Sequence, residues 1–370
     1  MFNFKQYDFR NYNYALLFVV IVLCSIGSFM IYLAKPDDFK KQLIGIILGL
    51  AIAVFVSIVD YHFIGNFFIA LYVMNILLLI YTRLFGPLIE NTKRWIKIGP
   101  VQFQTSEISK VILIIFLAKF FEVMRNKIDK WWVIVGSMIL TAIPTYLILK
   151  QPDLSSSMVS MFIFVVMIFA AGLSYRIIFP IVAIGLPTIV VLFWYVQQPF
   201  QKILTEYQQN RIISILNPNL YGDLMYQQNN SIAAIRAGGL YGKLLNSTAS
   251  TVRAYDAVPV RESDFIFAVI GEEFGFIGCC ILFCLFGIVI LKGVQIARNA
   301  ADRLGMLIAT GVSAMFMFQV FVNIGVATAM LPNTGLPLPF ISSGLSSLIG
   351  GMIGVGLLLN IYMYRKNVRG

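Results

Sequence analysis

The chain is built from apolar stretches of roughly 18–25 residues, the length that an α-helix needs to cross a hydrocarbon layer of about 30 Å. Lipid offers the backbone no hydrogen bonds, so each stretch should be helical, and the alternation of a membrane barrel is absent. We therefore expect an all-α polytopic membrane protein, a single membrane domain over residues 1–370, with about ten transmembrane helices at 14–34, 42–59, 64–84, 106–124, 131–149, 155–171, 177–197, 264–292, 304–331 and 342–364.

Composition supports this interpretation and excludes several functions. Hydrophobic residues make up 59% of the chain and charged residues only 12%, whereas a soluble domain has roughly 25% charged residues. A single histidine, His62, excludes a His-rich metal site and a Ser-His-Asp triad. The cysteines lie in apolar stretches without metal-ligand spacing, so we expect them to pack as small hydrophobic residues.

One loop, residues 198–263 between the seventh and eighth predicted spans, is long enough to carry structure outside the membrane. The lysines and arginines of the short loops favour cytoplasmic termini once this long loop is left out of the comparison. The long loop would then be extracytoplasmic. The positive charge on that side suits either lipid headgroups or an anionic ligand at the outer face.

The loop re-enters the membrane at Asp264, at the start of a strongly apolar span. A charge at a span is costly and therefore marks a candidate functional site. One interpretation is structural, because an aspartate caps the free N–H groups at a helix start. The other is chemical: a carboxylate held at the membrane surface as a general base, with Arg261 nearby. The two interpretations are compatible.

The connection 150–155 is a second candidate site. Pro152 frees backbone groups and allows a tight re-entry into the membrane. Lys150 and Asp153 form either a simple turn with a local ion pair or, together with Gln151, the polar wall of a cavity. That wall would face the same side as Asp264.

The connection 91–100 is a third candidate site, because Trp95 directly follows Lys93 and Arg94. A tryptophan among cations at a membrane edge is commonly an interface anchor. The same cations suit a phosphate, since arginine offers a forked set of donors. The tryptophan ring would then stack on a sugar face.

Ionisable side chains also occur within the predicted spans. Glu107 and Lys110 are three residues apart and share a helix face, where they either pair with each other or polarise a cavity. Glu272 lies about two helical turns below Asp264 and roughly on the same face. We expect these side chains to be polar groups of the cavity.

Two loops rich in glycine complete the candidate segments. The break at 332–344 contains Pro, Gly and the hydroxyl pair Ser342 and Ser343. Freed backbone groups at membrane depth are tolerated where they line protein or water, so this break indicates a cavity. The run 237–242 lacks a strand-loop-helix context, so it is not a nucleotide-binding P-loop.

Five of these segments resemble the SEDS proteins (shape, elongation, division and sporulation) of the RodA and FtsW type. They are 263–273, 93–96, 150–154, 231–243 and 335–343, and the resemblance covers nearly the whole chain. The chain departs from the family's usual residues at 105–107, 262–263 and 342–346. The last two departures concern the fine geometry of the site.

The resemblance implies a peptidoglycan glycosyltransferase that polymerises lipid II at the outer leaflet of the bacterial plasma membrane, with cytoplasmic termini. It implies that Asp264 is the catalytic carboxylate and that Trp95 and Asp153 belong to the functional cavity. The implied partners are lipid II, membrane lipid and a class B penicillin-binding protein that cross-links the product, and no nucleic acid. Elongation, division and sporulation stay open as the process served.

In such a reaction a sugar hydroxyl attacks an anomeric carbon and a lipid pyrophosphate leaves, so negative charge needs cations or a metal. We expect Asp264 to accept the hydroxyl proton, a role worth roughly 10²–10⁴-fold. No cofactor is certain, and a divalent Mg or Mn ion beside Asp264 stays open. A lipid II flippase and a non-catalytic scaffold for the penicillin-binding protein are the alternatives. The expected substrate contacts are Lys93, Arg94, Trp95, Lys150, Gln151, Asp153, Arg211, Arg236, Lys243, Arg261, Ser342 and Ser343.

Overall fold

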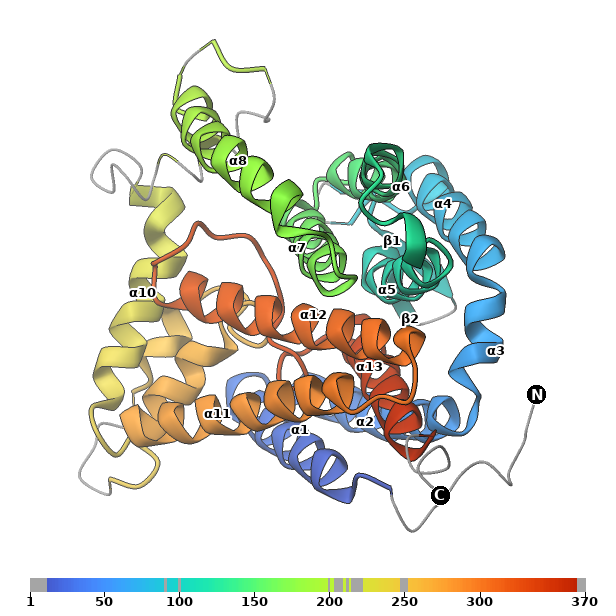
Figure 1. Ribbon diagram of the computed structural model, residues 1–370. Helices are drawn as coiled ribbons and strands as arrows, with labels where there is room; N and C mark the ends of the chain where they lie inside the picture. Colours follow the sequence, from blue (N-terminus) through green and yellow to red (C-terminus); the bar gives the residue numbers. More distant parts are fainter. Residues whose placement is uncertain are drawn as a thin grey trace.

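The apolar stretches form helices in the computed structural model, which describes residues 12–89, 92–98, 101–198, 200–202, 209–210, 213, 222–246 and 252–364. Within these residues, one two-stranded hairpin (Figure 1) and two short 3-10 helices interrupt the helical pattern. The elements are α1 (Tyr14–Ala34), α2 (Pro36–Ile58), α3 (Tyr61–Asn66), α4 (Phe68–Phe85), β1 (Trp95–Ile98), β2 (Val101–Gln104), α5 (Thr105–Val123), η3 (Arg125–Lys127), α6 (Trp131–Leu149), α7 (Leu154–Ala170), α8 (Tyr175–Val196), α10 (Gly222–Gly238), η4 (Ala254–Ala257), α11 (Ile266–Arg298), α12 (Arg303–Ala327) and α13 (Leu345–Tyr364).

Local chemistry explains where two helices depart from the predicted ranges. The second helix begins at Pro36, before the predicted residue 42, because proline suits a first helical turn. Asp37 and Asp38 in that turn also favour the positive helix end. The predicted span 64–84 is divided at Phe67 into α3 and α4.

The centre of the bundle is formed by α5, α12 and α13, whose side chains are mostly buried. Helix α12 packs on α5, α7 and α11, and α13 packs on α2, α5 and α12 (Figure 1). In the described part of the chain, the helices long and apolar enough to cross a membrane are α1, α2, α4, α6, α11, α12 and α13. The chain is therefore a multi-pass, essentially all-helical membrane protein, and the count of ten crossings stays a prediction.

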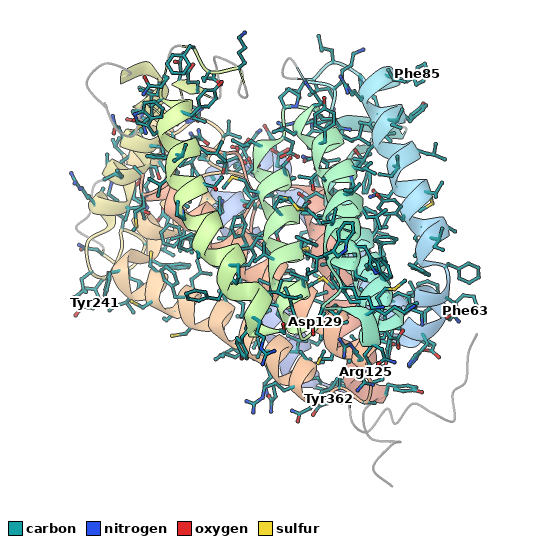
Figure 2. All side chains as sticks on the ribbon, turned by 45° about the horizontal axis from the view of Figure 1, so that its top comes forward. Phe63, Phe85, Arg125, Asp129, Tyr241 and Tyr362 are labelled. Carbon is teal, nitrogen blue, oxygen red and sulfur yellow. The ribbon has the colours of Figure 1, made fainter. Side chains whose placement is uncertain are left out.

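The two ends of the bundle can be told apart by their contacts. Tyr12, just before α1, donates to the Ser57 hydroxyl (3.4 Å), and Asn360 of α13 donates to the Ser57 carbonyl (2.7 Å). The start of α1 and the end of α13 therefore share one end, which we call the inner end. Arg261 donates to the carbonyl of Ala34 at the other end of α1 (3.0 Å), which we call the outer end. Figure 2 shows residues of α3, η3 and α13 at one end of the bundle and the last residue of α4 at the opposite end.

Helix α11 is broken at Gly275, where φ is 66°. The Gly-rich run after α10 lies against this break, and a Cβ on Gly275 would sit 2.6 Å from the Leu240 carbonyl oxygen. Glycine is therefore required there for both conformation and space. Backbone N–H groups on each side of the break bond across it: Phe276 to the Gly239 carbonyl (2.9 Å), Ile277 to Leu240 (3.2 Å), Lys243 to Glu272 (2.9 Å) and Leu244 to Glu273 (3.1 Å).

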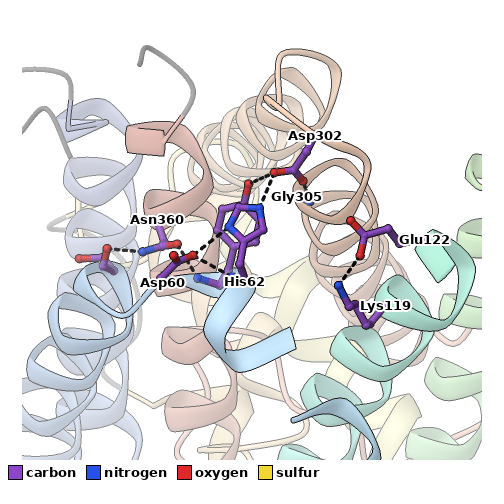
Figure 3. Close-up of polar contacts among 9 residues, drawn as sticks. Asp60, His62, Lys119, Glu122, Asp302, Gly305 and Asn360 are labelled. Carbon is purple, nitrogen blue, oxygen red and sulfur yellow. Dashed lines mark hydrogen bonds and ion pairs between the residues drawn. The ribbon is translucent and has the colours of Figure 1, made fainter. Parts of the chain in front are cut away.

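A polar cluster at the inner end contains the only histidine of the chain (Figure 3). His62 Nδ1 lies 2.9 Å from Asp60 Oδ1, and its Nε2 lies 2.8 Å from Asp302 Oδ2. Carboxylates only accept hydrogen bonds, so this geometry favours the imidazolium form of the ring, in which both ring nitrogens donate. Asp302 also accepts the Tyr61 hydroxyl and, through Oδ1, the backbone N–H of Gly305 (2.7 Å). We call these residues the His62 cluster.

Candidate active site

Asp264 lies at the outer end, in the segment between η4 and α11, and is partly exposed. Its carboxylate accepts a hydrogen bond from the Ser263 hydroxyl (3.1 Å). The N-cap residue of α11 is Phe265, one residue after Asp264, and its side chain makes no capping hydrogen bond. A surface cavity of about 520 Å³ lies beside this segment and is lined in part by Lys35, Arg261 and Glu262.

Hydrogen bonds to successive carbonyl oxygens fix the backbone around Asp264. Ser343 N–H donates to the Glu262 carbonyl (2.8 Å), and the Ser342 hydroxyl donates to the Ser263 carbonyl (2.6 Å). Ser342 and Ser343, which the sequence predicted as substrate contacts, thus hold the segment that carries the carboxylate.

Asp153 is a second carboxylate of the outer end, and it is 97% buried, with a relative exposure of 3%. It caps α7 through the Ser156 N–H (3.0 Å) and accepts further hydrogen bonds from Ser106 Oγ (2.8 Å) and Gln104 Nε2 (2.8 Å). Burial alone would raise the pKa of Asp153, but these hydrogen bonds and the Arg94 charge outweigh it, so the pKa lies below its usual value. Asp153 is therefore ionised and a weak base at neutral pH, and its oxygens are already engaged as hydrogen-bond acceptors.

The β1–β2 hairpin connects the cationic segment to this anchor, and the sequence pattern did not predict it. Trp95 pairs with Gln104 in the hairpin register, and Gln104 is the residue that donates to Asp153. The Arg94 guanidinium lies 5.8 Å from the centre of the Trp95 ring. The indole N–H of Trp95 is buried and finds no acceptor in the described residues.

Residues 334–335 lie between the two carboxylates. The single hydroxyl hydrogen of Ser155 is shared between Asp153 Oδ1 (3.1 Å) and the Thr334 carbonyl (2.9 Å). Gly335 has φ of 70°, and a Cβ built on it would lie 3.2 Å from Asp264 Oδ2. The structure thus brings together the predicted segments around Asp153 and Asp264 and the Pro/Gly-rich break.

Several predicted ligand contacts are instead engaged in ion pairs. Lys243 Nζ lies 2.5 Å from Glu272 Oε1, and the Glu272 side chain has no exposed surface. Glu272 also accepts the backbone N–H groups of Ala254 and Tyr255 (both 2.7 Å). Glu272 is therefore an anchor for the loop that follows α10, and its expected place among the polar groups of a cavity stays a prediction.

Arg261 is also held by the protein itself. Its guanidinium lies 3.2 Å from Asp256 Oδ1 and donates to the carbonyls of Asp256 (2.9 Å) and Ala34 (3.0 Å). Within the helices, Lys110 Nζ lies 2.8 Å from Glu107 Oε1, with side-chain exposures of 0% and 4%. The two side chains therefore satisfy each other inside the bundle.

The other predicted cations differ from these. Lys93 is exposed and reaches the Leu84 carbonyl (3.4 Å), and Lys150 lies 5.4 Å from the centre of the Tyr146 ring. Within the described ranges neither lysine forms an ion pair with a carboxylate. Arg236 is exposed at the end of α10, and Arg211 lies outside the described residues. Gln151 is buried and donates to the Leu79 carbonyl (2.9 Å).

Asn323 of α12 is a site residue that the sequence analysis missed. Its amide donates to the backbone carbonyl of Asp264 (3.0 Å). A polar residue within an apolar span was the available signal, since such a group needs a partner. The described residues contain no group of three or more His, Cys, Asp or Glu side chains arranged to hold a metal ion.

The chain is similar in sequence to known proteins over nearly its whole length. Residues 11–367 match the family model of the FtsW, RodA and SpoVE cell cycle proteins. The chain is 31% identical to the probable peptidoglycan glycosyltransferase FtsW of Bacillus subtilis, over 96% of this chain and 92% of that protein. It is also 31% identical to the peptidoglycan glycosyltransferase MrdB of Escherichia coli, over 95% of this chain and 93% of that protein.

Solved structures show the same fold. A chain of a peptidoglycan synthase complex that coordinates polymerization and crosslinking superposes with a TM-score of 0.82 at 30% identity, over 96% of this chain and 98% of that chain. The rod shape determining protein RodA of Thermus thermophilus gives a TM-score of 0.71 at 28% identity, over the same shares of the two chains. The chain therefore belongs to the FtsW/RodA/SpoVE family of cell cycle proteins.

Proposed function

We propose that this chain is a peptidoglycan glycosyltransferase that polymerises lipid II at the outer leaflet of a bacterial plasma membrane, with both termini in the cytoplasm. The observation that carries the proposal is the placement of Asp264. Asp264 is partly exposed at one end of the helical bundle, two residues after Glu262, which lines a surface cavity, and hydrogen bonds hold its backbone in place. The relatives that carry the name peptidoglycan glycosyltransferase support the same reaction.

In the proposed reaction, the oxygen of an acceptor sugar hydroxyl forms a bond to the anomeric carbon of a second lipid-linked disaccharide. The bond from that carbon to the pyrophosphate oxygen breaks, and the lipid pyrophosphate leaves with the electron pair. Asp264 accepts the hydroxyl proton, which is a general-base role worth roughly 10²–10⁴-fold. Asp153 does not share this role, because its carboxylate is buried and its hydrogen bonds hold the hairpin and α7.

The leaving pyrophosphate needs positive charge, and the contacts of the cations rank the candidates. Lys243 and Arg261 already neutralise carboxylates. Lys93 and Lys150 form no such pair in the described residues, so they are the better pyrophosphate ligands. A divalent Mg or Mn ion would find one protein ligand in Asp264, with pyrophosphate oxygens and water as its other ligands, an arrangement that suits Mg²⁺. Whether the reaction requires such an ion stays a prediction.

The test is polymerisation of lipid II by purified protein with a cognate class B penicillin-binding protein, the partner that we propose from the matching synthase complex. Asp264→Asn should abolish polymer formation, because the amide cannot accept the proton. Asp37→Asn is the matched control, since Asp37 is exposed in the first turn of α2 at the same end of the bundle. Polymer at the wild-type rate from Asp264→Asn would remove Asp264 from the mechanism.

The same preparation separates the alternative functions. A flippase in vesicles would move labelled lipid II between leaflets without making polymer. A scaffold would support cross-linking by the penicillin-binding protein whether or not Asp264 is intact. The proposed enzyme makes polymer only with Asp264 intact.

A further inference from the structure

Asn323 is buried in the middle of an apolar stretch of α12, with a relative exposure of 1%. Its amide nitrogen makes two hydrogen bonds, to the backbone carbonyl of Asp264 (3.0 Å) and to the backbone carbonyl of Leu336 (2.7 Å). The two N–H groups of one amide therefore join two irregular segments of chain. A buried carbonyl without a partner is costly in a membrane protein, so both bonds are needed where they are.

The Asp264 carboxylate lies between these two segments. One segment carries Asp264, and the other carries Gly335, whose missing Cβ leaves room for Asp264 Oδ2. A Cβ there would lie 3.2 Å from that oxygen, which is tighter than an ordinary contact. Asn323 thus holds the carboxylate at a defined separation from the Gly335 backbone.

The segment opposite the carboxylate is also fixed from its other side. The Thr334 carbonyl accepts the Ser155 hydroxyl (2.9 Å), and Ser155 belongs to the start of α7, which Asp153 caps. The Leu338 N–H donates to the Ser342 hydroxyl (2.7 Å), which itself donates to the Ser263 carbonyl. Asn323 is the side chain that bonds directly to the backbone of Asp264 and to the residue after Gly335.

We propose that Asn323 is a positioning residue for the reaction: through its two carbonyl bonds it sets the direction in which the Asp264 carboxylate meets the acceptor hydroxyl. This assignment rests on the proposed function of Asp264. General-base catalysis needs the base within hydrogen-bond reach of the proton that it accepts, and small displacements of a catalytic group are expensive in rate. Asn323 touches neither the reacting atoms nor the carboxylate oxygens, so its effect falls on the turnover step and not on substrate binding.

The test is the kinetics of lipid II polymerisation by Asn323→Leu. Leucine has a similar size but no N–H donors, so kcat should fall roughly tenfold to a hundredfold. The KM for lipid II should change by less than about twofold, because the lost interaction is not one with bound substrate. A variant with a wild-type kcat, or one in which KM rises while kcat is unchanged, would overturn the assignment.

Two matched asparagines separate positioning from loss of stability. Asn360→Leu removes an equally buried clamp at the inner end, which bonds to the Ser57 carbonyl (2.7 Å) and the Tyr61 N–H (3.2 Å). It should lower the unfolding temperature with kcat unchanged. Asn75→Leu replaces a buried amide of α4 that makes no hydrogen bond to the described residues, so it should leave kcat unchanged and should not lower the unfolding temperature. If Asn360→Leu lowers kcat as much as Asn323→Leu does, the effect is general destabilisation and the proposal fails.

If Asn323→Leu does not accumulate, Gly335→Ala decides the matter from the other side of the carboxylate. Its methyl group would press on Asp264 Oδ2 without changing α12. A reduced kcat with an unchanged KM supports the proposal, and wild-type kinetics overturn it. Asp264→Asn, measured alongside, tells the two claims apart. If it still makes polymer, the proposed function fails, whereas an inactive Asp264→Asn beside a fully active Asn323→Leu refutes only the positioning role.

Discussion

The His62 cluster at the inner end and the Asp264 segment at the outer end use their carboxylates in opposite ways. At the inner end, Asp60 and Asp302 bond to the two ring nitrogens of His62, so opposite charges meet side chain to side chain. At the outer end, the neighbours of Asp264 bond largely to main-chain carbonyls, and Gly335 faces the carboxylate with no side chain at all.

The difference separates stability from chemistry. A carboxylate that neutralises a histidine stabilises the fold, but this partner lowers the carboxylate's pKa and makes it a weaker base. The backbone around Asp264 is fixed by hydrogen bonds from Asn323 and Ser342 to main-chain carbonyls. These bonds define the direction of the carboxylate. Changes in the His62 cluster should therefore act on stability, and changes at Asp264 should act on rate.

The sharpest test of this contrast makes the same isosteric substitution, Asp to Asn, at Asp264 and at Asp302. Asp264→Asn should lower the polymerisation rate roughly 10²–10⁴-fold with little change in unfolding temperature. Asp302→Asn should keep its rate per folded molecule and lose about 1–3 kcal/mol of stability, because the amide removes the acceptor of His62 and Tyr61. Thermal unfolding in detergent and a gel assay of glycan polymer measure both. Loss of polymerisation by a fully folded Asp302→Asn would break the comparison.

Asp153 should combine both behaviours. Asp153→Asn turns an acceptor of Gln104, Ser106 and Ser156 into a group that is partly a donor, and it removes a buried charge near Arg94. We expect a stability loss of about 3–5 kcal/mol and a roughly tenfold lower rate, since the hairpin with Trp95 is displaced.

Asp129→Asn is the control for Asp153, because the Asp129 carboxylate accepts one exposed backbone N–H from Ser174 (2.8 Å). Unfolding temperature and polymerisation rate are measured on both variants. An Asp153→Asn protein as active and as stable as Asp129→Asn would show that the outer network is dispensable.

Cations of the outer end should divide in the same way. Lys93→Gln combined with Lys150→Gln should raise the KM for lipid II roughly a hundredfold or more, since each of the two charge-assisted bonds to pyrophosphate is worth about 1.5–3 kcal/mol. Lys243→Gln should leave KM unchanged and lower the unfolding temperature, because Lys243 pairs with the fully buried Glu272. Lys41→Gln is a suitable control, as Lys41 is 81% exposed and pairs with Asp38. A KM effect confined to Lys243→Gln would reverse the ranking of the cations.

The smallest expected effect is a pH dependence of stability from the His62 cluster. Burial of the ring lowers the pKa of His62, but the bonds to Asp302 and Asp60 outweigh this and raise it above its ordinary 6.5. A raised pKa in the folded state means stabilisation that is complete below pH 6.5 and is lost as pH rises through the folded value.

The contribution of Asp302 to stability depends on pH in the opposite direction from that of His62. Burial alone would raise its pKa, but bonds from His62, the Gly305 N–H and Tyr61 hold the pKa below its ordinary 3.8. Its contribution is therefore present above pH 3.8 and is lost at lower pH. Unfolding temperatures measured on either side of pH 6.5 should fall with rising pH in the wild type and be flatter in His62→Leu. An identical slope in both proteins would contradict the charged bridge.

The sequence predicted most of the helices because each apolar stretch is self-sufficient in backbone hydrogen bonds. It did not predict the hairpin at Trp95, whose strands are short and whose value lies in the bond from Gln104 to Asp153. Boundaries shifted where a proline or acidic first turn extended a helix, as at Pro36.

For the site, the sequence identified the segments but not the roles of single residues. Lys243 and Arg261 looked like ligands for an anion because their carboxylate partners, Glu272 and Asp256, are brought to them by the fold. Asn323 was overlooked because its significance depends on which carbonyls it meets. Polar side chains in a membrane protein acquire their roles from long-range neighbours, which spacing along the chain does not show.

The mended break at Gly275 has a consequence for biogenesis. The run 239–244, which completes the hydrogen bonds of α11, is synthesised before α11 itself. Its backbone groups are therefore already present when the interrupted helix leaves the ribosome. Until the two meet, the carbonyls and amides at the interruption have no partners, and lipid cannot supply any. The eighth apolar stretch therefore matures as a composite of two parts of the chain, and a truncation that ends before Phe276 would leave the earlier part without its counterpart.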